Sequence, residues 1–487
     1  MKYLLAYDFG TGGIKASLYD EAGQCIADGF DGYPTYYPSA GFHEQEPEAW
    51  WQATVSSTHK LVSTLSDEVK QHIVGIGISG HSLGVVPLDE KGKLLRDRTP
   101  IWSDARAVEE AKQVFQRIPE AEWYRMTGNG FPAQLYSSFK LMWFRDHEPE
   151  MFKQIAIVLG TKDYINYKLT GVCATDQSYA SGSGVYDLKA RAYSARLIDA
   201  SGLPASIFAK IVPSTQVLGT LTPEAAQALG LPQSVKVVAG GVDNSCMSLG
   251  AGAFRDGRAY NSLGSSSWIA VSSAQPLLDD VKRSYVFDHV VPGQYVSALA
   301  IFSAGTAFNW VKGVMAKELS YKEIDAESAT SPVGSNGVFF IPTLSGPKGK
   351  GGFVGLELRH TRADLLRATQ EGIAFGLRNV LTELKKLVEV KEPLILVGGG
   401  ANAAFTRQLY ADVYNIEIMR TSIGQQCAAL GAAVLAGIGT GVWKDFSVMD
   451  TFVRPAERHQ PDAPVAQQYK ELFKRFLVVT NSMEELG

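Results

Sequence analysis

Runs of apolar residues separated by turns mark the strands of an α/β protein along the whole chain. Residues 3–7 form a short apolar strand, 10–13 a glycine-rich turn, and from Ile14 apolar and polar side chains alternate, which predicts a β-hairpin. The fully apolar run 73–78 predicts a buried central strand. Further strands are expected at 236–241, 259–263, 268–271 and 394–397.

Segments with helical periodicity separate these strands. Helices are expected at 46–65, 106–118, 137–147, 161–169, 364–387, 465–484 and, rich in small residues that permit unusually close packing, 427–437. The second half repeats the plan of the first, with a strand, a glycine- and hydroxyl-bearing turn, a returning strand and then helices. The 487 residues exceed what one hydrophobic core usually organises, so we expect two α/β domains, 1–246 and 247–487.

The amino-acid composition is that of an ordinary globular protein and does not indicate a binding site. Hydrophobic residues make up 45% and charged residues 20%, as in ordinary globular proteins, and a net charge of −4 gives no reason to expect nucleic acid or an anionic membrane as partner. No stretch approaches 18 uninterrupted apolar residues, and the four cysteines show no disulfide or metal-ligand spacing. The expected compartment is therefore the cytoplasm.

The turn at 8–13, with the sequence DFGTGG, carries the first chemical signal. Glycines let several backbone N–H groups converge on one phosphate, because they remove side-chain bulk and tolerate positive φ. The pattern is neither a Walker A loop nor a Rossmann GxGxxG. A plain turn of type I′ geometry explains the glycines equally well. Asp8 interrupts an apolar strand directly before the turn, where its carboxylate can hold Mg²⁺ through water or form an Asx-type turn.

Two later glycine segments and one aspartate extend this pattern. SLGSSS at 262–267 repeats the turn in the second half, so the two turns are expected to face each other across a cleft and hold one polyphosphate. VGGGAN at 397–402 sits between a strand and a helix, which suits a nucleoside or a tight connection. Asp243 follows a buried strand and two glycines, where it can accept a proton in phosphoryl transfer or cap the next helix.

Seven segments, in order, resemble the FGGY carbohydrate kinases, and within them the xylulokinase-like branch. The segments span nearly the whole chain: DFGTGGIKASLYD (8–20), GFHEQEPEAWW (41–51), SSFKLMWFRDHEPE (137–150), GGVDNS (240–245), SLGSSS (262–267), GKGGFVGLELRHTRADLLRATQEG (349–372) and VGGGANAAFTRQLYAD (397–412). The resemblance implies two actin-like, ribonuclease-H-like domains with a central ATP and sugar cleft. It also implies ATP-dependent phosphorylation of a small sugar or polyol, a ketopentose such as xylulose above all.

The same resemblance implies roles for individual residues. Asp243 would be the general base, and Asp8 would lie by the transferred phosphate and contact Mg²⁺ through water. The phosphate and nucleotide contacts implied are Thr11, Gly12, Lys15, Gly264, Ser265, Gly305, Asn309, Gly399, Gly400 and Asn402. The sugar contacts implied are His81, Ser82, Trp102, Asp104 and Asn244. Three of these residues have alternative interpretations. His81 can be a structural loop histidine, and Trp102 can be a residue of the cleft wall. Asp104 can form a surface ion pair with Arg106.

Departures from the family pattern keep the substrate open. Xylulokinases typically carry SGQMHG where this chain has SGHSLG at 79–84, so Ser82 and Leu83 replace a methionine and a histidine. A site that loses a hydrogen-bonding partner loses discrimination strongly. Another ketose such as ribulose, a tetritol, a pentitol or an autoinducer-type metabolite is therefore an alternative substrate. A non-catalytic, actin-like nucleotide-binding regulator is the alternative from another class, and a homodimer is one assembly that the sequence leaves open.

Two smaller departures fall in the signature segments. Leu135, just ahead of the 137–150 segment, and Gln370, inside the 349–372 segment, differ from the family pattern. Both lie where we expect packing to absorb the difference.

Overall fold

The chain forms two compact α/β units that are not contiguous in sequence. The computed structural model describes residues 1–344 and 350–485. Unit 1 comprises Met1–Phe254, Ser272–Ser297 and Gln426–Val453, and unit 2 comprises Arg255–Val271, Ala298–Gln425 and Arg454–Gly487. The sequence-based division into 1–246 and 247–487 concerns contiguous domains and stays a prediction.

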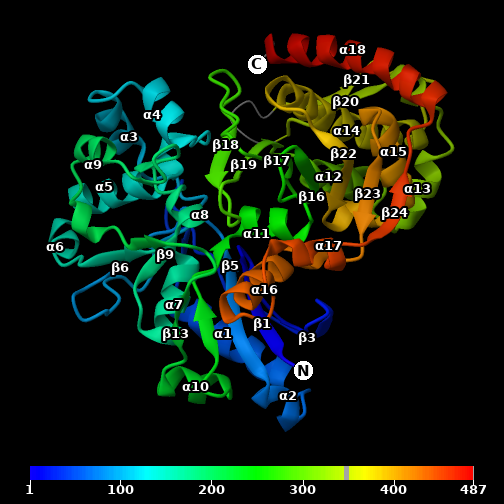
Figure 1. Cartoon of the computed structure of the whole chain (residues 1–487). Coiled ribbons are helices and arrows are strands. Elements are labelled where there is room, and N and C mark those ends of the chain that lie inside the picture. Colours follow the sequence, from blue (N-terminus) through cyan, green and yellow to red (C-terminus); the bar gives the residue numbers. More distant parts are fainter. Residues whose placement is uncertain (345–349, 486–487) are drawn as a thin grey trace. The chain divides into compact units, whose positions relative to one another are not determined.

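A mixed sheet forms the centre of unit 1 (Figure 1). Its order is β13 (Val217–Thr220), β14 (Lys236–Val238), β5 (Ile73–Gly80), β1 (Tyr3–Gly10), β2 (Gly13–Tyr19) and β3 (Cys25–Gly32), and β15 (Gly241–Val242) also pairs with β5. β1 and β2 pair antiparallel with Asp8 opposite Lys15, and β1 pairs parallel to β5 with Asp8 beside Ser79. The predicted hairpin and the predicted buried central strand are both confirmed.

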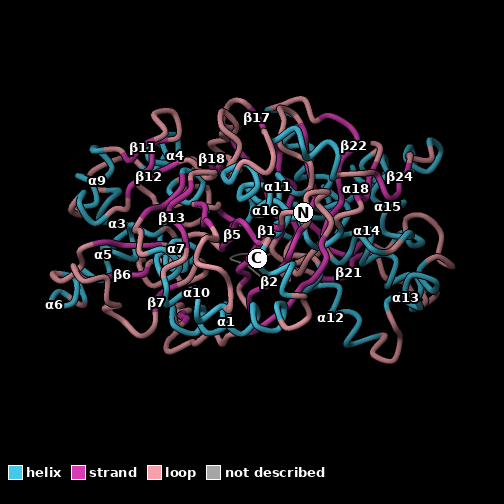
Figure 2. Tube along the Cα trace, turned by 60° about the horizontal axis from the view of Figure 1, so that its bottom comes forward, coloured by secondary structure: helices cyan, strands magenta, loops and turns pink. Residues whose placement is uncertain are grey.

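Helices cover the two faces of this sheet. α1 (Pro47–Val62) packs on β2 and β3, while α16 (Cys427–Thr440) packs on β1 and β5 and against α11 (Asp243–Gly250). Figures 1 and 2 both show α16 beside β1 and α11. The contact is close because it is made of glycine and alanine: a Cβ on Gly77 would lie 2.0 Å from the carbonyl oxygen of Ala432. The predicted close packing of this small-residue helix is confirmed.

A second part of unit 1 surrounds a cluster of buried aromatic side chains that includes Trp123, Tyr136 and Phe139. Its main helices are α3 (Val108–Phe115), α4 (Glu120–Thr127), α5 (Ser137–His147), α7 (Thr161–Thr170) and α9 (Ala195–Ser201). The shorter elements of unit 1 are α2 (Asp67–Gln71), α6 (Pro149–Phe152), α8 (Gln177–Ala180), α10 (Pro223–Leu229), α17 (Met449–Phe452), β4 (Glu44–Gln45), β6 (Val86–Leu88), β7 (Thr99–Pro100), β8 (Ile157–Leu159), β9 (Ala174–Asp176), β10 (Tyr186–Asp187), β11 (Ala192–Tyr193), β12 (Lys210–Val212) and β18 (Tyr285–Asp288). The predicted helices at 106–118, 137–147 and 161–169 are confirmed.

Unit 2 is built on a second mixed sheet. Those of its strands that lie wholly or partly in unit 2 run in the order β19 (Tyr295–Ile301), β17 (Ser267–Ser273), β16 (Arg258–Leu263), β22 (Lys391–Val397), β23 (Ile418–Thr421) and β24 (Pro455–His459). The helices are α12 (Gly305–Met315), α13 (Tyr321–Ser328), α14 (Arg362–Leu387), α15 (Ala404–Tyr414) and α18 (Ala463–Glu485), with a small hairpin of β20 (Phe339–Ile341) and β21 (Gly352–Val354). α14 begins after a capping box in which the backbone N–H of Thr361 donates to Asp364 at 2.8 Å.

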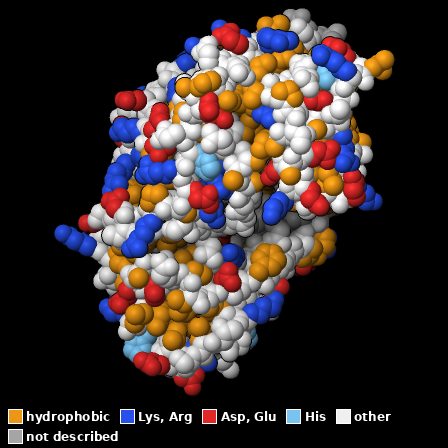
Figure 3. All heavy atoms as spheres, turned by 90° about the vertical axis from the view of Figure 1, so that its right-hand side faces the viewer, with side chains coloured by type: hydrophobic (Ala, Val, Ile, Leu, Met, Phe, Trp, Pro, Cys, Tyr) orange, Lys and Arg blue, Asp and Glu red, His pale blue; other side chains and the backbone are white. Residues whose placement is uncertain are grey.

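The charges on the surface and the character of the helices are those expected from the composition. On the face drawn in Figure 3, basic and acidic side chains are mixed, and neither sign dominates. None of the helices in the described part of the chain combines the length and the apolar character that a membrane crossing requires.

Candidate active site

The turn between β1 and β2 is held in place by side chains of unit 1. Tyr33 donates to the carbonyl oxygen of Gly10 at 2.5 Å, and Gln45 donates to that of Thr11 at 2.7 Å. Trp50 in turn donates to Gln45 Oε1 at 2.9 Å. The turn's carbonyl oxygens, which would repel a phosphate, are thereby engaged. Gln45 and Trp50 belong to the segment 41–51, so this segment supports the turn.

The glycines of this turn are not required by turn geometry. None of residues 10–13 has a positive φ, so the type I′ interpretation is wrong. A Cβ on Gly12 would meet no atom within 4 Å, whereas a Cβ on Gly13 would lie 2.4 Å from the carbonyl oxygen of Asp31. Packing therefore explains why residue 13 is glycine. Gly12 is not required by packing, and its exposed backbone is accessible to a ligand.

The other two residues predicted at the phosphates already have partners. Thr11 Oγ1 accepts a hydrogen bond from the indole of Trp102 at 3.0 Å, which leaves the hydroxyl hydrogen of Thr11 able to donate. Lys15 lies 3.4 Å from Asp28, and its side chain is about one-third exposed. A phosphate would have to compete with Asp28 for Lys15.

Asp8, near the end of β1, and Asp243, directly after β15, belong to two strands that flank β5 and run parallel to it. Ser79 of β5 stands between them, because it is paired with Asp8 on one side and with Gly241 of β15 on the other. Ser79 Oγ donates to Asp8 Oδ1 at 2.8 Å, so Asp8 is a strand residue and the Asx-turn alternative is wrong. Asp243 is the first residue of α11, whose N-cap is Val242, so the capping alternative for Asp243 is also wrong.

Both carboxyl groups have raised pKa values, and the charge of Asp8 contributes to that of Asp243. Burial, followed by the negative charge of Asp8, raises the pKa of Asp243 to about 7. Burial also raises the pKa of Asp8, although the Ser79 hydroxyl and the Lys15 ammonium act in the opposite direction. A carboxyl group with a pKa near neutral pH is suited to accept and release a proton.

The carboxylate of Asp8 suits a hard divalent cation. Mg²⁺ usually takes one or two carboxylates and completes its shell with water and phosphate oxygens. Asp8 therefore fits Mg²⁺ when water and phosphates supply the remaining ligands. Within residues 1–344 and 350–485 no group of three or more His, Cys, Asp or Glu side chains could hold a metal without such a ligand.

A kink in the chain places Asp243. The predicted strand 236–241 is interrupted, because Gly240 has φ +73° and a Cβ there would lie 2.2 Å from the carbonyl oxygen of Ile78. The strand is therefore split into β14 and β15, and the prediction of one continuous strand is wrong. The second piece ends directly before Asp243.

A network of buried charged and polar side chains fixes the backbone of this kinked segment. Lys162 lies 2.5 Å from Asp163 and 2.9 Å from Asp176, and its ammonium also donates to the carbonyl oxygen of Ala239 at 3.1 Å. Ser178 donates to Asp176 and accepts from the backbone N–H of Val242 at 2.9 Å. The backbone on both sides of Gly240 is thus fixed, and the sequence analysis did not identify this network.

The residues predicted to contact the sugar differ in burial. His81 is 2% exposed, packs edge-on against Trp50 at 5.8 Å between ring centroids, and approaches Thr161 Oγ1 at 3.3 Å. Burial lowers the pKa of His81 to about 4, so its imidazole is neutral. Ser82 and Asn244 are half-buried, and Trp102 is 37% exposed. Their contacts with a sugar stay predictions.

Asp104 is enclosed rather than exposed. Its carboxylate accepts from the backbone N–H of His43 at 2.7 Å and pairs with Arg106 at 2.8 Å, and the side chain is fully buried. The alternative of a surface ion pair is therefore wrong, because the pair lies inside unit 1. Arg106 also reaches Glu44 at 2.6 Å, which ties the segment 100–106 to the segment that supports the glycine turn.

Lys140 and Leu83 belong to the interior of the same region. Lys140 donates to the carbonyl oxygens of Leu83 at 3.0 Å and Ile101 at 2.6 Å, and burial lowers its pKa to about 7. Leu83 has φ +62° and is 1% exposed in a hydrophobic cluster, against which Leu135 also packs. The position of the typical xylulokinase histidine is thus filled here by an apolar core residue.

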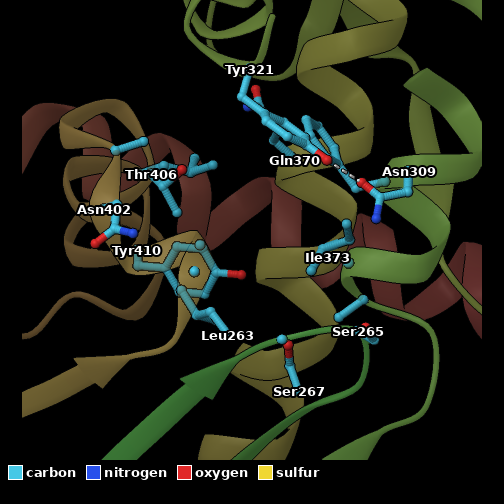
Figure 4. A pocket seen from close by; sticks show the side chains of 18 of the residues that line it. Leu263, Ser265, Ser267, Asn309, Tyr321, Gln370, Ile373, Asn402, Thr406 and Tyr410 are labelled. Carbon is cyan, nitrogen blue, oxygen red and sulfur yellow. Dashed lines mark hydrogen bonds between the residues drawn. The ribbon is translucent and has the colours of Figure 1, made fainter. Parts of the chain in front are cut away.

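A cavity of about 530 Å³ lies in unit 2 (Figure 4). All seven residues predicted for unit 2's nucleotide contacts line it, namely Gly264, Ser265, Gly305, Asn309, Gly399, Gly400 and Asn402. They come from the β16–β17 turn, the start of α12 and the segment after β22. The structure therefore gathers these segments around one cavity of the size that a nucleotide-sized ligand needs.

Backbone contacts shape the glycine-rich end of the cavity. The carbonyl oxygen of Gly264 accepts from the N–H of Gly305 at 3.0 Å, and that of Ser265 accepts from the N–H of Thr306 at 3.1 Å. A Cβ on Gly305 would lie 2.5 Å from Gly264 O, so glycine is required there. Gly398 has φ +89° and approaches Leu263 in the same way, which leaves Gly399 and Gly400 at the cavity wall.

Several residues that line the cavity were not predicted from the sequence as nucleotide contacts, namely Phe308, Tyr321, Gln370, Ile373 and Tyr410. Figure 4 shows Tyr321 and Gln370 at the end away from Ser265 and Ser267, near the predicted Asn309, whose Oδ1 accepts from the Tyr321 hydroxyl at 2.9 Å. The prediction that packing absorbs Gln370 is wrong, because this side chain lines the cavity. The first residue of the segment 349–372, residue 349, lies outside the described part of the chain, and the rest of the segment lies within it.

Family models for known proteins match both halves of the chain. The model of the FGGY family of carbohydrate kinases, N-terminal domain, matches residues 3–250, and the model of the C-terminal domain of that family matches residues 259–440.

Individual relatives are similar over their full length. The chain is 29% identical to a xylulose kinase of Bacillus subtilis (strain 168), covering 100% of this chain and 98% of the relative. It is 26% identical to a gluconokinase of Bacillus licheniformis, covering 99% and 96%. Among solved structures, xylulose kinase from Rhodospirillum rubrum superposes with a TM-score of 0.91 at 29% identity, covering 100% of this chain and 99% of the other. The predicted family and its two-domain α/β fold are confirmed.

Proposed function

Because the chain belongs to the FGGY family of carbohydrate kinases, we propose that it transfers the γ-phosphoryl group of ATP to a hydroxyl group of a small polyhydroxylated substrate. A ketopentose such as xylulose is the first candidate, since relatives of this length carry the name xylulose kinase. The observation that carries the proposal is the pair Asp8 and Asp243 beside the open backbone of Gly12.

In this proposal Asp243 is the general base. Its carboxylate takes the proton of the attacking substrate hydroxyl, the substrate oxygen forms a bond to the γ-phosphorus, and the bond from that phosphorus to the β–γ bridging oxygen breaks to release ADP. A base with a pKa of about 7 is half ionised at neutral pH and contributes typically about 10²–10⁴-fold to the rate. A binding protein without catalysis has no use for such a group.

Asp8 is proposed to hold Mg²⁺, which neutralises phosphate charge when it is bound. Ser79 and the β1–β5 pairing keep the Asp8 carboxylate in one position. Thr11 and Gly12 are proposed to donate to the phosphates, and Lys15 to exchange Asp28 for a phosphate oxygen.

The unit 2 cavity is proposed to bind the rest of the nucleotide. The turn residues Gly264 and Ser265 are assigned to the phosphates, and Asn309 and Asn402 to the nucleoside. We also propose that the nucleotide packs closely against the backbone of Gly305, Gly399 and Gly400, because glycine has no side chain to prevent this.

For the sugar we propose Asn244, Ser82 and Trp102 as direct contacts, because they are the least buried of the candidates. His81 and Asp104 are proposed to shape the wall behind them. Leu83 offers no hydrogen bond at a position where xylulokinases typically carry histidine, so a pentitol, a tetritol, ribulose or an aldonate remains within the proposal.

A coupled assay of ADP release across ketopentoses, pentitols, tetritols and gluconate tests this function. We expect ATP turnover to be stimulated by one substrate class at least about tenfold over ATP alone, and phosphate to appear on that substrate by mass spectrometry. Nucleotide binding with no stimulation by any member of the panel would favour a non-catalytic regulator instead.

A further inference from the structure

Gln370 has an unusual environment at the end of the cavity distant from the glycine turns. It lies on α14, is 8% exposed, and is one of the cavity-lining residues. Its Nε2 donates to Asp325 Oδ1 at 2.7 Å. Its Oε1 is buried and has no hydrogen-bond partner in the described part of the chain. A buried acceptor without a partner is costly, and native proteins rarely keep one without a reason.

Asp325 determines which way the Gln370 amide faces. A carboxylate only accepts hydrogen bonds, so the amide NH₂ has to face Asp325 and the carbonyl oxygen has to face away from it. The opposite orientation would bring two acceptor oxygens together. The carbonyl oxygen of Gln370, a residue that lines the cavity, therefore points away from Asp325 and has no hydrogen-bond partner among the described residues.

The walls around this acceptor suit a flat ring. Phe308 and Tyr321 stack at 6.1 Å between centroids with an angle of 22°, and Ile373 and Tyr410 also line the cavity. Aromatic and aliphatic walls with a few polar groups are typical of sites that bind a heterocycle and fix its orientation. Of the polar side chains near Tyr321, Asp325 accepts from Gln370 and Asn309 accepts from Tyr321, whereas Gln370 Oε1 is an acceptor without a partner among the described residues, so the ligand group that matches it is an N–H donor.

Resting on the proposed function, in which this cavity holds the nucleotide, we propose that Gln370 is a specificity-determining residue that accepts a hydrogen bond from the exocyclic amino group of adenine. A 6-oxopurine places an acceptor oxygen at the same position. It would leave Gln370 Oε1 unpaired and add repulsion between two oxygens. Gln370 therefore selects 6-aminopurine nucleotides and rejects 6-oxopurine nucleotides. Because Gln370 departs from the family pattern, this selection belongs to this chain's own residues.

Binding titrations of the full-length protein with ATP, inosine triphosphate and purine riboside triphosphate test the proposal. Wild type is expected to bind ATP at least about tenfold more tightly than either analogue, since each analogue lacks the amino group. In Gln370→Leu the preference for ATP over inosine triphosphate should fall to within about threefold of unity. Gln227→Leu, a change of the same kind at an exposed glutamine of α10, is the matched control and should keep the wild-type preference.

The outcomes separate this inference from the proposed function. An unchanged ATP preference in folded Gln370→Leu would overturn the role of Gln370 and leave the kinase proposal intact. Failure of wild type to bind any of the three nucleotides would overturn both. If Gln370→Leu does not fold, the wild-type comparison of ATP with purine riboside triphosphate still decides, because equal affinities would show that no residue reads the amino group.

Discussion

The two glycine turns of this chain have similar sequences and different supports. In unit 1, side chains of Tyr33 and Gln45 hold the turn between β1 and β2 by its carbonyl oxygens. In unit 2, backbone N–H groups at the start of α12 hold the turn between β16 and β17 in the same way. Both arrangements occupy the carbonyl oxygens of a turn. The two turns therefore share a sequence pattern but are held in place in different ways.

The surroundings of the two turns differ in chemistry as well. The turn of unit 1 lies by two carboxyl groups with raised pKa values, Asp8 and Asp243. The turn of unit 2 opens into a cavity whose walls are glycine backbone, aromatic rings and amide side chains. We infer that unit 1 carries the chemistry and unit 2 most of the nucleotide binding, so changes in each should affect different kinetic constants.

The largest effect is expected from Asp243→Asn. The amide cannot accept the substrate proton, so kcat should fall at least about 10²-fold, while the Kd for ATP should stay within about threefold of wild type because the cavity is untouched. Stopped assays of phosphorylated product and calorimetric titration with ATP measure the two quantities. Near-normal turnover in this variant would remove Asp243 as the base.

A matched pair of alanine substitutions separates packing from ligand contact within the first turn. Gly13→Ala should destabilise the fold by about 1–3 kcal/mol, because the new Cβ would lie 2.4 Å from Asp31 O. Gly12→Ala meets no neighbouring atom, so its free energy of unfolding should change by less than about 0.5 kcal/mol. Denaturant unfolding measures both values.

Activity then shows whether Gly12 contacts phosphate. In Gly12→Ala the KM for ATP should rise on the order of tenfold, since a methyl group would displace a phosphate from the backbone. If Gly12→Ala has wild-type stability and wild-type kinetics, the turn does not touch the nucleotide. That result would make the two turns of the molecule functionally unlike.

The smallest effect concerns stability and pH. The pKa of Asp243 is raised in the folded state to about 7 from an ordinary value near 3.8. The folded protein therefore binds this proton more tightly than the unfolded chain, and stability is lost as pH rises from about 4 through about 7. Asp243→Asn removes this loss. Its Tm should exceed that of wild type at pH 8 by about 1 °C for each kcal/mol gained, and by less at pH 5. Equal differences at the two pH values would contradict the raised pKa.

Local patterns were enough to predict several central elements of both units. Alternation gave the β1–β2 hairpin, and the apolar run at 73–78 became β5. The helix predicted at 137–147 is α5, Ser137–His147. These predictions succeed because residues that are neighbours in sequence determine the periodicity of a strand or helix.

The failures share a dependence on residues distant in sequence. The kink at Gly240 arises from the approach of Ile78, some 160 positions earlier in the chain, and the burial of Asp104 depends on His43 and Glu44. Gln370 lines a cavity whose other walls come from α12, α13 and α15. No periodicity in the sequence reports which segments will meet, so these properties could be learned only from the three-dimensional arrangement.

The position of α16 in the chain has a consequence for biosynthesis. This helix covers β1 and β5 and packs against α11, yet it is formed by Cys427–Thr440. A ribosome must therefore translate almost the whole of unit 2 before the sheet that contains Asp8 can bury its second face. Until then the apolar surface of β1 and β5 lacks the cover of α16, and we expect the nascent chain to be prone to aggregation through that surface.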